Sequence, residues 1–408
     1  MPNSSLFFAE EKIIDSATST FNKIDKLSKE DIKNAYKSIF KSYKSLYKQF
    51  RRLIKLSDKQ QLKLNSLNEA LEIRKHFIKK IFGRYLSEDI VATLLETPDG
   101  LKLGGERRVV TIMMTDLRGF TALCETLSPE NVLKIINTYL EVISEVVLKY
   151  NGTIDEIIGD GLFIIFGAPI QKSDDAIRSV ACAIDMQLAM ITVNQRIQKM
   201  GFPELELGIG INTGEVVVGN IGSQFRTKYG LIGSNVNLTA RIESYTIGGQ
   251  ILISENTLKA CGDTVQVNNT FEVLPKGLAK PINIYDINGI KAPYHLFLQK
   301  QKDEMFTLET PLPVLLYLIK QKHVCDDALH GVIIKLNKAS CIIECEIRLE
   351  MLSNIKMTLF DENNNPVSQE LYAKINKNMT NHSTHYKIHF TSIPQEARNF
   401  FNGVMSKI

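Results

Sequence analysis

Histidine is missing from the middle of this 408-residue chain. All seven histidines lie at position 76 or at 295 and beyond. Ser-His-Asp and Cys-His hydrolysis, His-ligated zinc and HExxH proteolysis are therefore excluded from the region between them. The chain also has no GxxxxGKS/T motif and no GxGxxG that opens a helix after a strand. P-loop and Rossmann nucleotide binding are thus unsupported.

Paired cysteines are missing too. The six cysteines include no CxxC pair, so the sequence predicts neither a disulfide framework nor a zinc cluster. The N-terminus lacks the basic start and apolar core of a signal peptide, and no run of about 18 apolar residues occurs. We therefore expect a cytoplasmic protein with no membrane-spanning segment.

Glycine is absent from the first 82 residues, and its distribution divides the chain. All 24 glycines lie at or after Gly83, and only Gly331 and Gly403 follow Gly289. A glycine-free start favours continuous helix, and a glycine-rich middle favours turns and backbone-lined sites. We expect a helical, coiled-coil dimerisation and signalling segment over 1–75, an α/β domain over 76–295 and a mainly β domain over 305–408.

The N-terminal segment has the pattern of a long amphipathic helix. Residues 20–75 lack proline and glycine, and apolar side chains recur at 36, 40, 43, 47, 50 and 54. This spacing predicts a helix that pairs with its own copy. Lys23 to Lys59 holds twelve basic and four acidic residues, whereas the whole chain has a net charge of only +4. The basic surface is either a solvated coiled-coil face or a contact for a regulatory protein or an anionic membrane surface.

The middle of the chain alternates strand-like and helix-like stretches. Residues 108–115 read as a buried strand, 128–149 as a helix, 153–157 and 162–166 as two strands, and 173–199 as a helix. Residues 206–212 and 215–220 read as a further pair of strands around a Thr-Gly turn. This order predicts an α+β, ferredoxin-like antiparallel core rather than a doubly wound parallel sheet.

Two aspartates stand beside glycines at the ends of these strands. Asp116 ends the first strand, before a turn formed by Gly119, Phe120 and Thr121, and Asp160 lies in the turn IIGDG. Each aspartate alone is more often a turn former or a helix cap. Together, without histidine or thiolate, they suit a hard cation such as Mg²⁺ or Mn²⁺, and the turn amides after Asp116 suit phosphates.

A second set of side chains is basic and polar. Asn237 and Arg241 stand four residues apart on one face of a predicted helix, and Lys276 precedes a glycine. Each alone is an ordinary surface residue. With the aspartates they have the composition of a phosphoryl-transfer site.

These residues lie in blocks that resemble the class III nucleotidyl cyclases, bacterial and cyanobacterial members above all. The resemblance covers about residues 80–290 and rests on blocks that include RYLSEDIV, VTIMMTDLRGFTALCETLS, GTIDEIIGDGLFIIFGAPI, LGIGINTGEVVVGNIGS and YGLIGSNVNLTARIES. It implies conversion of a nucleoside triphosphate to its 3′,5′-cyclic monophosphate and pyrophosphate.

The resemblance also implies the roles of single residues. Asp116, Asp160 and the carbonyl of Leu117 match the positions that hold two divalent cations, Mg²⁺ or Mn²⁺, in each site. Asn237 and Arg241 match the pair that stabilises the transition state, and Lys276 matches the lysine on the terminal phosphates. In this family the metals and the transition-state pair come from different subunits, which implies a homodimer with two composite sites.

Base selection departs from the adenylyl cyclase pattern at two positions. Glu156 stands where adenylyl cyclases usually have lysine, and Gly230 where they have aspartate or threonine. A glutamate accepts hydrogen bonds from guanine N1–H and N2–H₂, so GTP is the favoured substrate and ATP the alternative, with pyrimidine triphosphates third. A cyclase fold that only senses nucleotide is the rival of another class, and the intact site residues argue against it.

The C-terminal segment shows only hydrophobic spacing. GVIIKL, SCIIECEI, NIKMTLF, QELYAKI and HYKIHF read as strands before a terminal helix at 394–405. The region weakly resembles a PilZ-like β-barrel, without the arginine pair and DxSxxG motif that bind cyclic di-GMP in that family. We expect either a small structural or dimer-supporting barrel or a regulatory module, and assign it no ligand.

Overall fold

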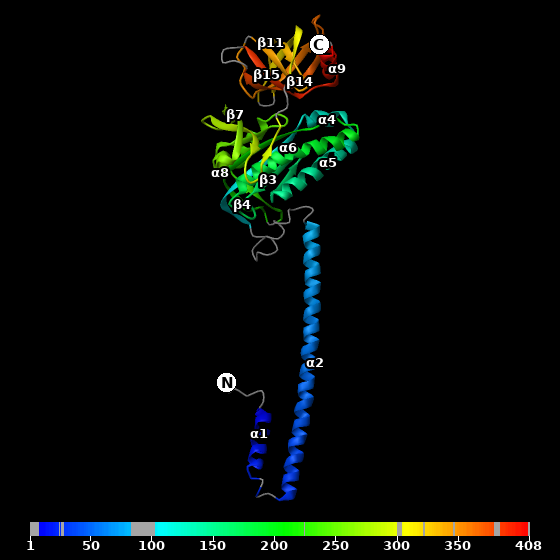
Figure 1. Ribbon diagram of the computed structural model, residues 1–408, viewed down its shortest axis with the longest axis vertical. Helices are drawn as coiled ribbons and strands as arrows, with labels where there is room; N and C mark the ends of the chain where they lie inside the picture. The colour runs from blue at the N-terminus through cyan, green and yellow to red at the C-terminus, as the bar shows by residue number, and fades with distance from the viewer. Residues whose placement is uncertain are drawn as a thin grey trace. The chain divides into compact units, whose positions relative to one another are not determined.

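The computed structural model describes residues 8–82 except 24, 26 and 27, residues 103–299 except 224, and residues 304–406 except 321, 322, 346 and 379–383. The chain divides into two compact units, one up to Ile81 and one from Phe82 onward, and each is considered by itself (Figure 1).

The described residues of the N-terminal unit form two α-helices, α1 (Phe8–Phe21) and α2 (Lys29–Phe82). The helix expected over 20–75 therefore begins at Lys29. A capping box sets this start, since Ser28 Oγ accepts from the Asp31 amide at 3.2 Å and Asp31 Oδ2 accepts from the Ser28 amide at 3.3 Å. The apolar stripe of α2 stays exposed within the chain, with Tyr43 65% and Phe50 61% exposed. Pairing with a second copy stays a prediction.

A nine-stranded sheet forms the base of the second unit. Seven strands run in the order β2 (Thr153–Ile158), β3 (Gly161–Phe166), β1 (Gly104–Arg118), β4 (Glu206–Gly222), β6 (Ile251–Ser254), β8 (Ile282–Ile290) and β7 (Val265–Val273). Strands β5 (Thr227–Ile232) and β9 (Leu296–Phe297) pair with β4 and β8. The antiparallel order β2-β3-β1-β4 confirms the ferredoxin-like core.

One expectation about this sheet was wrong. Residues 206–222 form the single strand β4 and not two strands around a Thr-Gly turn. The reason is its partner: β1 pairs with β4 without interruption from Gly104 to Arg118. Gly214 is needed for close approach and not for a turn, because a Cβ there would lie 2.4 Å from the Asn235 side chain.

Helices cover both faces of the sheet. On one face α5 (Pro129–Lys149) and α6 (Asp175–Lys199) pack on Met113, Ile164 and Ile209 in the main core (Figure 1). The other helices are α4 (Phe120–Thr126), α7 (Ser234–Ser244), α8 (Glu255–Cys261) and the 3₁₀ turn η2 (Gly262–Thr264). Among the described residues α6 alone has the length and apolar composition of a membrane span, and 56% of its most apolar window is buried in this core.

The C-terminal strands close into a barrel. Its order is β10 (Phe306–Lys320), β11 (His323–Leu336), β12 (Ser340–Cys345), β15 (His385–Ser392), β14 (Pro366–Asn378) and β13 (Asn354–Phe360). Alternate residues such as Leu312, Val314 and Leu316 fill the interior, and Phe401 of α9 (Gln395–Met405) packs against it. The expected small barrel is thus confirmed, whereas its likeness to PilZ stays a prediction.

The clearest stability prediction concerns Arg178, a buried cation at the start of α6. Its side chain is 5% exposed, pairs with Asp174 and Asp175, and donates to the Tyr150 carbonyl at 2.6 Å and the Asn151 carbonyl at 3.1 Å. Arg178→Met removes the cation from two carboxylates and a donor from two backbone carbonyls. We expect it to lower the free energy of unfolding by about 3–5 kcal/mol in urea denaturation.

Arg196→Met on the same helix is the matched control. Arg196 pairs with Glu141 at 3.2 Å on the surface, so its loss should cost at most about 1 kcal/mol. Equal effects of the two substitutions would show that burial of the Arg178 pairs does not matter.

Candidate active site

Asp116 and Asp160 lie at the same end of neighbouring strands. Asp116 is near the end of β1, Asp160 is in the turn between β2 and β3, and β1 pairs with β3 up to Thr115 and Leu162. Asp160 Oδ2 accepts from the Leu117 amide at 3.0 Å. The sheet therefore brings together the three residues that the sequence predicts as metal ligands.

Sheet geometry also fixes the turn that carries Asp160. Thr115 Oγ1 accepts from the Leu162 amide at 3.1 Å. Gly159 has φ +63, and a Cβ at Gly161 would lie 2.5 Å from the Thr115 carbonyl oxygen. The positive φ at Gly159 favours glycine, and at Gly161 any side chain would clash with β1, so Gly161 permits the close approach of this turn to the strand.

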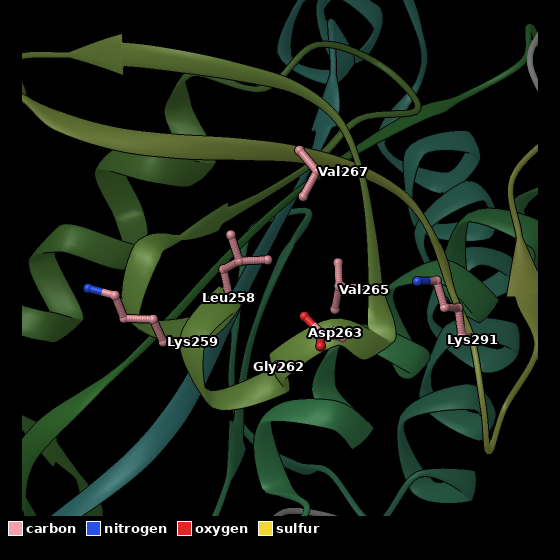
Figure 2. A pocket seen from close by; sticks show the side chains of 7 residues that line it. All are labelled: Leu258, Lys259, Gly262, Asp263, Val265, Val267 and Lys291. Atoms are coloured by element: carbon pink, nitrogen blue, oxygen red, sulfur yellow. The ribbon is translucent and has the colours of Figure 1, made fainter.

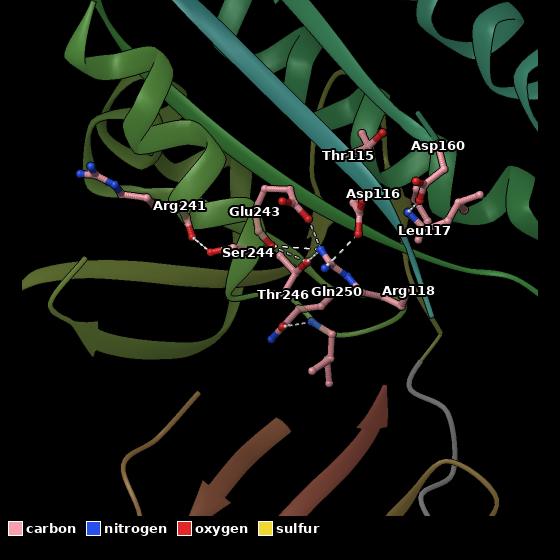
Figure 3. A network of polar contacts seen from close by, with 12 residues as sticks. Thr115, Asp116, Leu117, Arg118, Asp160, Arg241, Glu243, Ser244, Thr246 and Gln250 are labelled. Atoms are coloured by element: carbon pink, nitrogen blue, oxygen red, sulfur yellow. Dashed lines mark hydrogen bonds and ion pairs between the residues drawn. The ribbon is translucent and has the colours of Figure 1, made fainter. Parts of the chain in front are cut away.

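The carboxylate of Asp116 stands in a crowded electrostatic environment. Burial raises its pKa to about 6, with further contributions from Glu243 and Asp160, while Arg118 opposes the rise. Arg118 Nη1 lies 3.2 Å from Asp116 Oδ2, and its Nη2 binds the Glu243 carboxylate and Thr246 Oγ1 (Figure 3). One guanidinium thus joins the end of β1 to the end of α7.

This end of the sheet could hold hard cations. Two carboxylates and the Leu117 carbonyl offer only oxygen donors. The raised pKa of Asp116 shows that its negative charge is incompletely compensated, and a cation would compensate it. No group of three His, Cys, Asp or Glu side chains forms a metal site within the described ranges. Further ligands would have to come from water or from a substrate.

The basic set lies together on a different part of the chain. Arg241 and the exposed Asn237 are on α7, and the guanidinium of Arg241 is 3.5 Å from where a Cβ of Gly277 would stand, next to the exposed Lys276. Figure 3 shows the Arg241 guanidinium pointing away from Asp116 and Asp160. One chain therefore does not bring the two sets of predicted residues together.

The two predicted base-reading positions lie next to an unexpected lysine. Lys228 Nζ is 2.7 Å from Glu156 Oε2 and 3.1 Å from Asp155 Oδ2. β2 has a bulge between Ile154 and Glu156, and the two acidic residues at this bulge contact Lys228 of β5. A Cβ on Gly230 would have no heavy atom closer than 3.8 Å, so the glycine leaves open space here.

One surface cavity, of about 610 Å³, contains none of these residues. It is lined by Leu258, Lys259, Gly262, Asp263, Val265, Val267 and Lys291 (Figure 2). The candidate site is therefore not this cavity.

Residues 105–289 match the family described as the adenylate and guanylate cyclase catalytic domain. The chain belongs to the class III nucleotidyl cyclases.

Relatives of this chain include adenylate cyclase 1 of Rhizobium meliloti, which is 29% identical over 230 residues; these cover 56% of this chain and 34% of the relative. The adenylate cyclase of Anabaena cylindrica is 29% identical over 242 residues, which cover 55% of this chain and 47% of the relative. The chain thus spans less than half the length of these curated relatives. Among solved structures, the guanylyl cyclase Cya2 is 55% identical over 48% of this chain and all of the other, with a TM-score of 0.48. The adenylyl cyclase CyaB from P. aeruginosa is 34% identical over 50% of this chain and all of the other, with a TM-score of 0.45.

Sequence reasoning missed four charged residues of the candidate site: Arg118, Glu243, Asp155 and Lys228. Lys228 had a usable signal, because residues i and i+2 of a strand share a face and Lys228 is two residues before Gly230. Arg118 and Glu243 are 125 residues apart, and no local pattern pairs them.

The raised pKa of Asp116 predicts the pH dependence of stability. The folded state binds this proton more tightly than the unfolded state, whose pKa is near 3.8, so Asp116 lowers stability as the pH rises from about 4 through about 6. Asp116→Asn removes this loss. The melting temperature of the variant minus that of the wild type should be larger at about pH 7.5 than at about pH 4.5 without metal.

Mn²⁺ should reduce the difference in melting temperature between Asp116→Asn and the wild type at about pH 7.5, because a bound cation stabilises the wild-type carboxylate. Glu215→Gln is the control, since Glu215 forms an exposed pair with Arg107. A difference that is the same at both pH values would contradict the prediction.

Proposed function

We propose that this protein is an enzyme that converts GTP to 3′,5′-cyclic GMP and pyrophosphate. The observation that supports GTP is the Glu156 carboxylate, held by Lys228 beside the open space at Gly230. It accompanies a family match whose predicted metal and transition-state positions are intact.

The hydrogen-bonding edge of guanine suits this arrangement. Guanine presents two donors, N1–H and N2–H₂, and one acceptor, O6. The Glu156 carboxylate accepts from both donors, and the Lys228 ammonium can donate to O6. With adenine, Glu156 has no N1–H to accept from, and the loss of a hydrogen bond to a charged group costs about 1.5–3 kcal/mol, or about ten- to a hundredfold in discrimination.

ATP is the second candidate, because Lys228 and Glu156 together can also bind adenine. Adenine presents one donor, N6–H₂, and one acceptor, N1, in the opposite order along its edge. Lys228 and Glu156 also present one donor and one acceptor, and the curated relatives from Rhizobium meliloti and Anabaena cylindrica are named adenylate cyclases. Pyrimidine triphosphates are third.

We place two divalent cations, Mg²⁺ or Mn²⁺, at Asp116, Asp160 and the Leu117 carbonyl. When bound, such cations lower the pKa of the ribose 3′-hydroxyl and neutralise the triphosphate. The amides of Gly119, Phe120 and Thr121 follow the end of β1 at Arg118 and would donate to the phosphate oxygens.

The remaining roles belong to side chains of α7 and the turn near it. Arg241 would neutralise charge as it develops at the α-phosphorus, an effect often worth about 3–4 kcal/mol. Asn237 would hold the ribose region, and Lys276 the terminal phosphates.

A homodimer completes this site in our proposal. Arg241 of one chain points away from Asp116 and Asp160 of the same chain (Figure 3), so the metal set of one chain would meet the α7 set of its copy, in two equivalent sites. The exposed apolar stripe of α2 would join the copies as a coiled coil. Its basic surface would remain for a regulatory protein or an anionic membrane.

We place the enzyme in the cytoplasm. All six cysteines are free in the structure, and unpaired cysteines are typical of a reducing compartment.

The substrate assignment predicts the outcome of an assay with all four triphosphates. Purified protein with Mn²⁺ should form cyclic GMP with a kcat/KM at least about tenfold above that for ATP. Glu156→Lys should lower this ratio by at least about tenfold, because the lysine cannot accept from N1–H. Larger formation of cyclic AMP by the wild type would disprove GTP specificity while leaving cyclase activity intact.

The composite site predicts complementation between two inactive variants. Asp116→Ala and Arg241→Ala should each lower kcat by at least about a hundredfold. When the two are mixed, half of the dimers carry one intact site, so activity should return to about a quarter of the wild-type value. Mixtures as inactive as the separate variants would contradict a site shared between chains. A mixture of Arg196→Met with the wild type controls for any activity that is lost when subunits exchange between dimers.

A further inference from the structure

A lysine of the C-terminal barrel is buried against the cyclase domain. Lys374 of β14 is 2% exposed, and its Nζ donates to the carbonyl oxygens of Ser244 at 2.6 Å and Thr246 at 3.0 Å. A buried amine is costly unless acceptors replace water. The two carbonyls are such acceptors, so this is a specific contact and not an incidental one.

The acceptors lie at the C-terminal end of α7. The last carbonyls of a helix have no partner within the helix, and this end carries a partial negative charge. Lys374 provides the missing donors. Ser244 Oγ donates in turn to the Arg241 carbonyl at 2.7 Å. The helical turn that follows Arg241 is thus tied to the barrel.

The protonation state of Lys374 does not remove this contact. Burial, with the nearby Arg118 guanidinium, lowers the pKa of Lys374 to about 7, while Glu243 and Asp116 oppose this. A neutral amine still has two N–H donors for the two carbonyls.

Two more barrel residues contact elements of the candidate site. Leu352, 3% exposed, packs in one apolar cluster with Ile242 of α7 and Leu252 of β6. The Thr391 carbonyl oxygen lies 2.7 Å from where a Cβ of Gly119 would stand. The barrel therefore contacts both the turn after the metal aspartate and the helix that carries Arg241.

We propose that the barrel is a positioning element of the cyclase, with Lys374 as the residue that positions Asn237 and Arg241 through the end of α7. This inference rests on the proposed function. Lys374 touches neither residue, and it acts by holding their helix in place. Transition-state groups need such support, because a displacement of about 1 Å can cost about a hundredfold in rate.

In the proposed dimer, the barrel of one chain contacts elements of both composite sites. The Gly119 turn and α7 of one chain belong to different composite sites. One barrel therefore supports one half of each site, and a displaced barrel would weaken both.

Lys374→Met in the full-length chain tests the proposal, because methionine keeps the apolar length and removes every donor. Its kcat for the triphosphate should fall at least about tenfold, with KM within about threefold of wild type. Amide hydrogen exchange should accelerate in residues 238–248 and stay unchanged in α5. Lys356→Met is the matched control, since Lys356 of the same barrel pairs with Glu370 at the surface.

A kcat for Lys374→Met within about twofold of wild type, or unchanged exchange in α7, would overturn the proposal. Should the methionine variant fail to fold, Lys374→Gln keeps N–H donors and carries the test, with an intermediate loss of kcat expected and a wild-type kcat overturning it. A wild type without cyclase activity would instead refute the proposed function, and the exchange measurement would still decide whether Lys374 holds α7.

Discussion

The position of strand β1 between β3 and β4 is the constraint on which the rest of the site depends. β1 pairs with β3 on one side and along its whole length with β4 on the other. Asp116 therefore lies beside the Asp160 turn and also beside α7, which packs on β1 and β4. A shift of one residue in either ladder would turn Asp116 to the other face of the sheet and separate it from both.

Arg118 neutralises part of the negative charge that this arrangement of strands brings together. Asp116, Asp160 and Glu243 place three carboxylates in one region, which without a cation would repel one another. The Arg118 guanidinium, whose side chain is 13% exposed, compensates part of that charge from inside the fold. Burial nevertheless raises the pKa of Asp116 to about 6. The negative charge of these carboxylates is thus only partly balanced within the chain, and a bound divalent cation would balance the rest.

Much of the fold and of the candidate metal site could be predicted from the sequence, because the patterns that indicate them lie within short segments of the chain. Strand and helix periods gave the ferredoxin-like order, and glycines beside Asp116 and Asp160 marked the ends of strands. The expected break in β4 was wrong because glycine in a strand can serve close approach as well as a turn. The bond from Lys374 to Ser244 spans 130 positions, and only the folded chain reveals such pairs.

The proposed base-reading position and one proposed metal ligand share one hairpin, and this relates substrate specificity to the proposed dimer. Glu156 in β2 and Asp160 in the following turn are four residues apart. Lys228 holds Glu156 from β5, which leads through Gly233 into α7. In the proposed dimer Glu156 thus belongs with the α7 set, whereas Asp160 belongs with the metal set of the other site. In the proposed dimer the base-reading position of one site and a metal ligand of the other site are therefore joined within one chain by the β2–β3 hairpin.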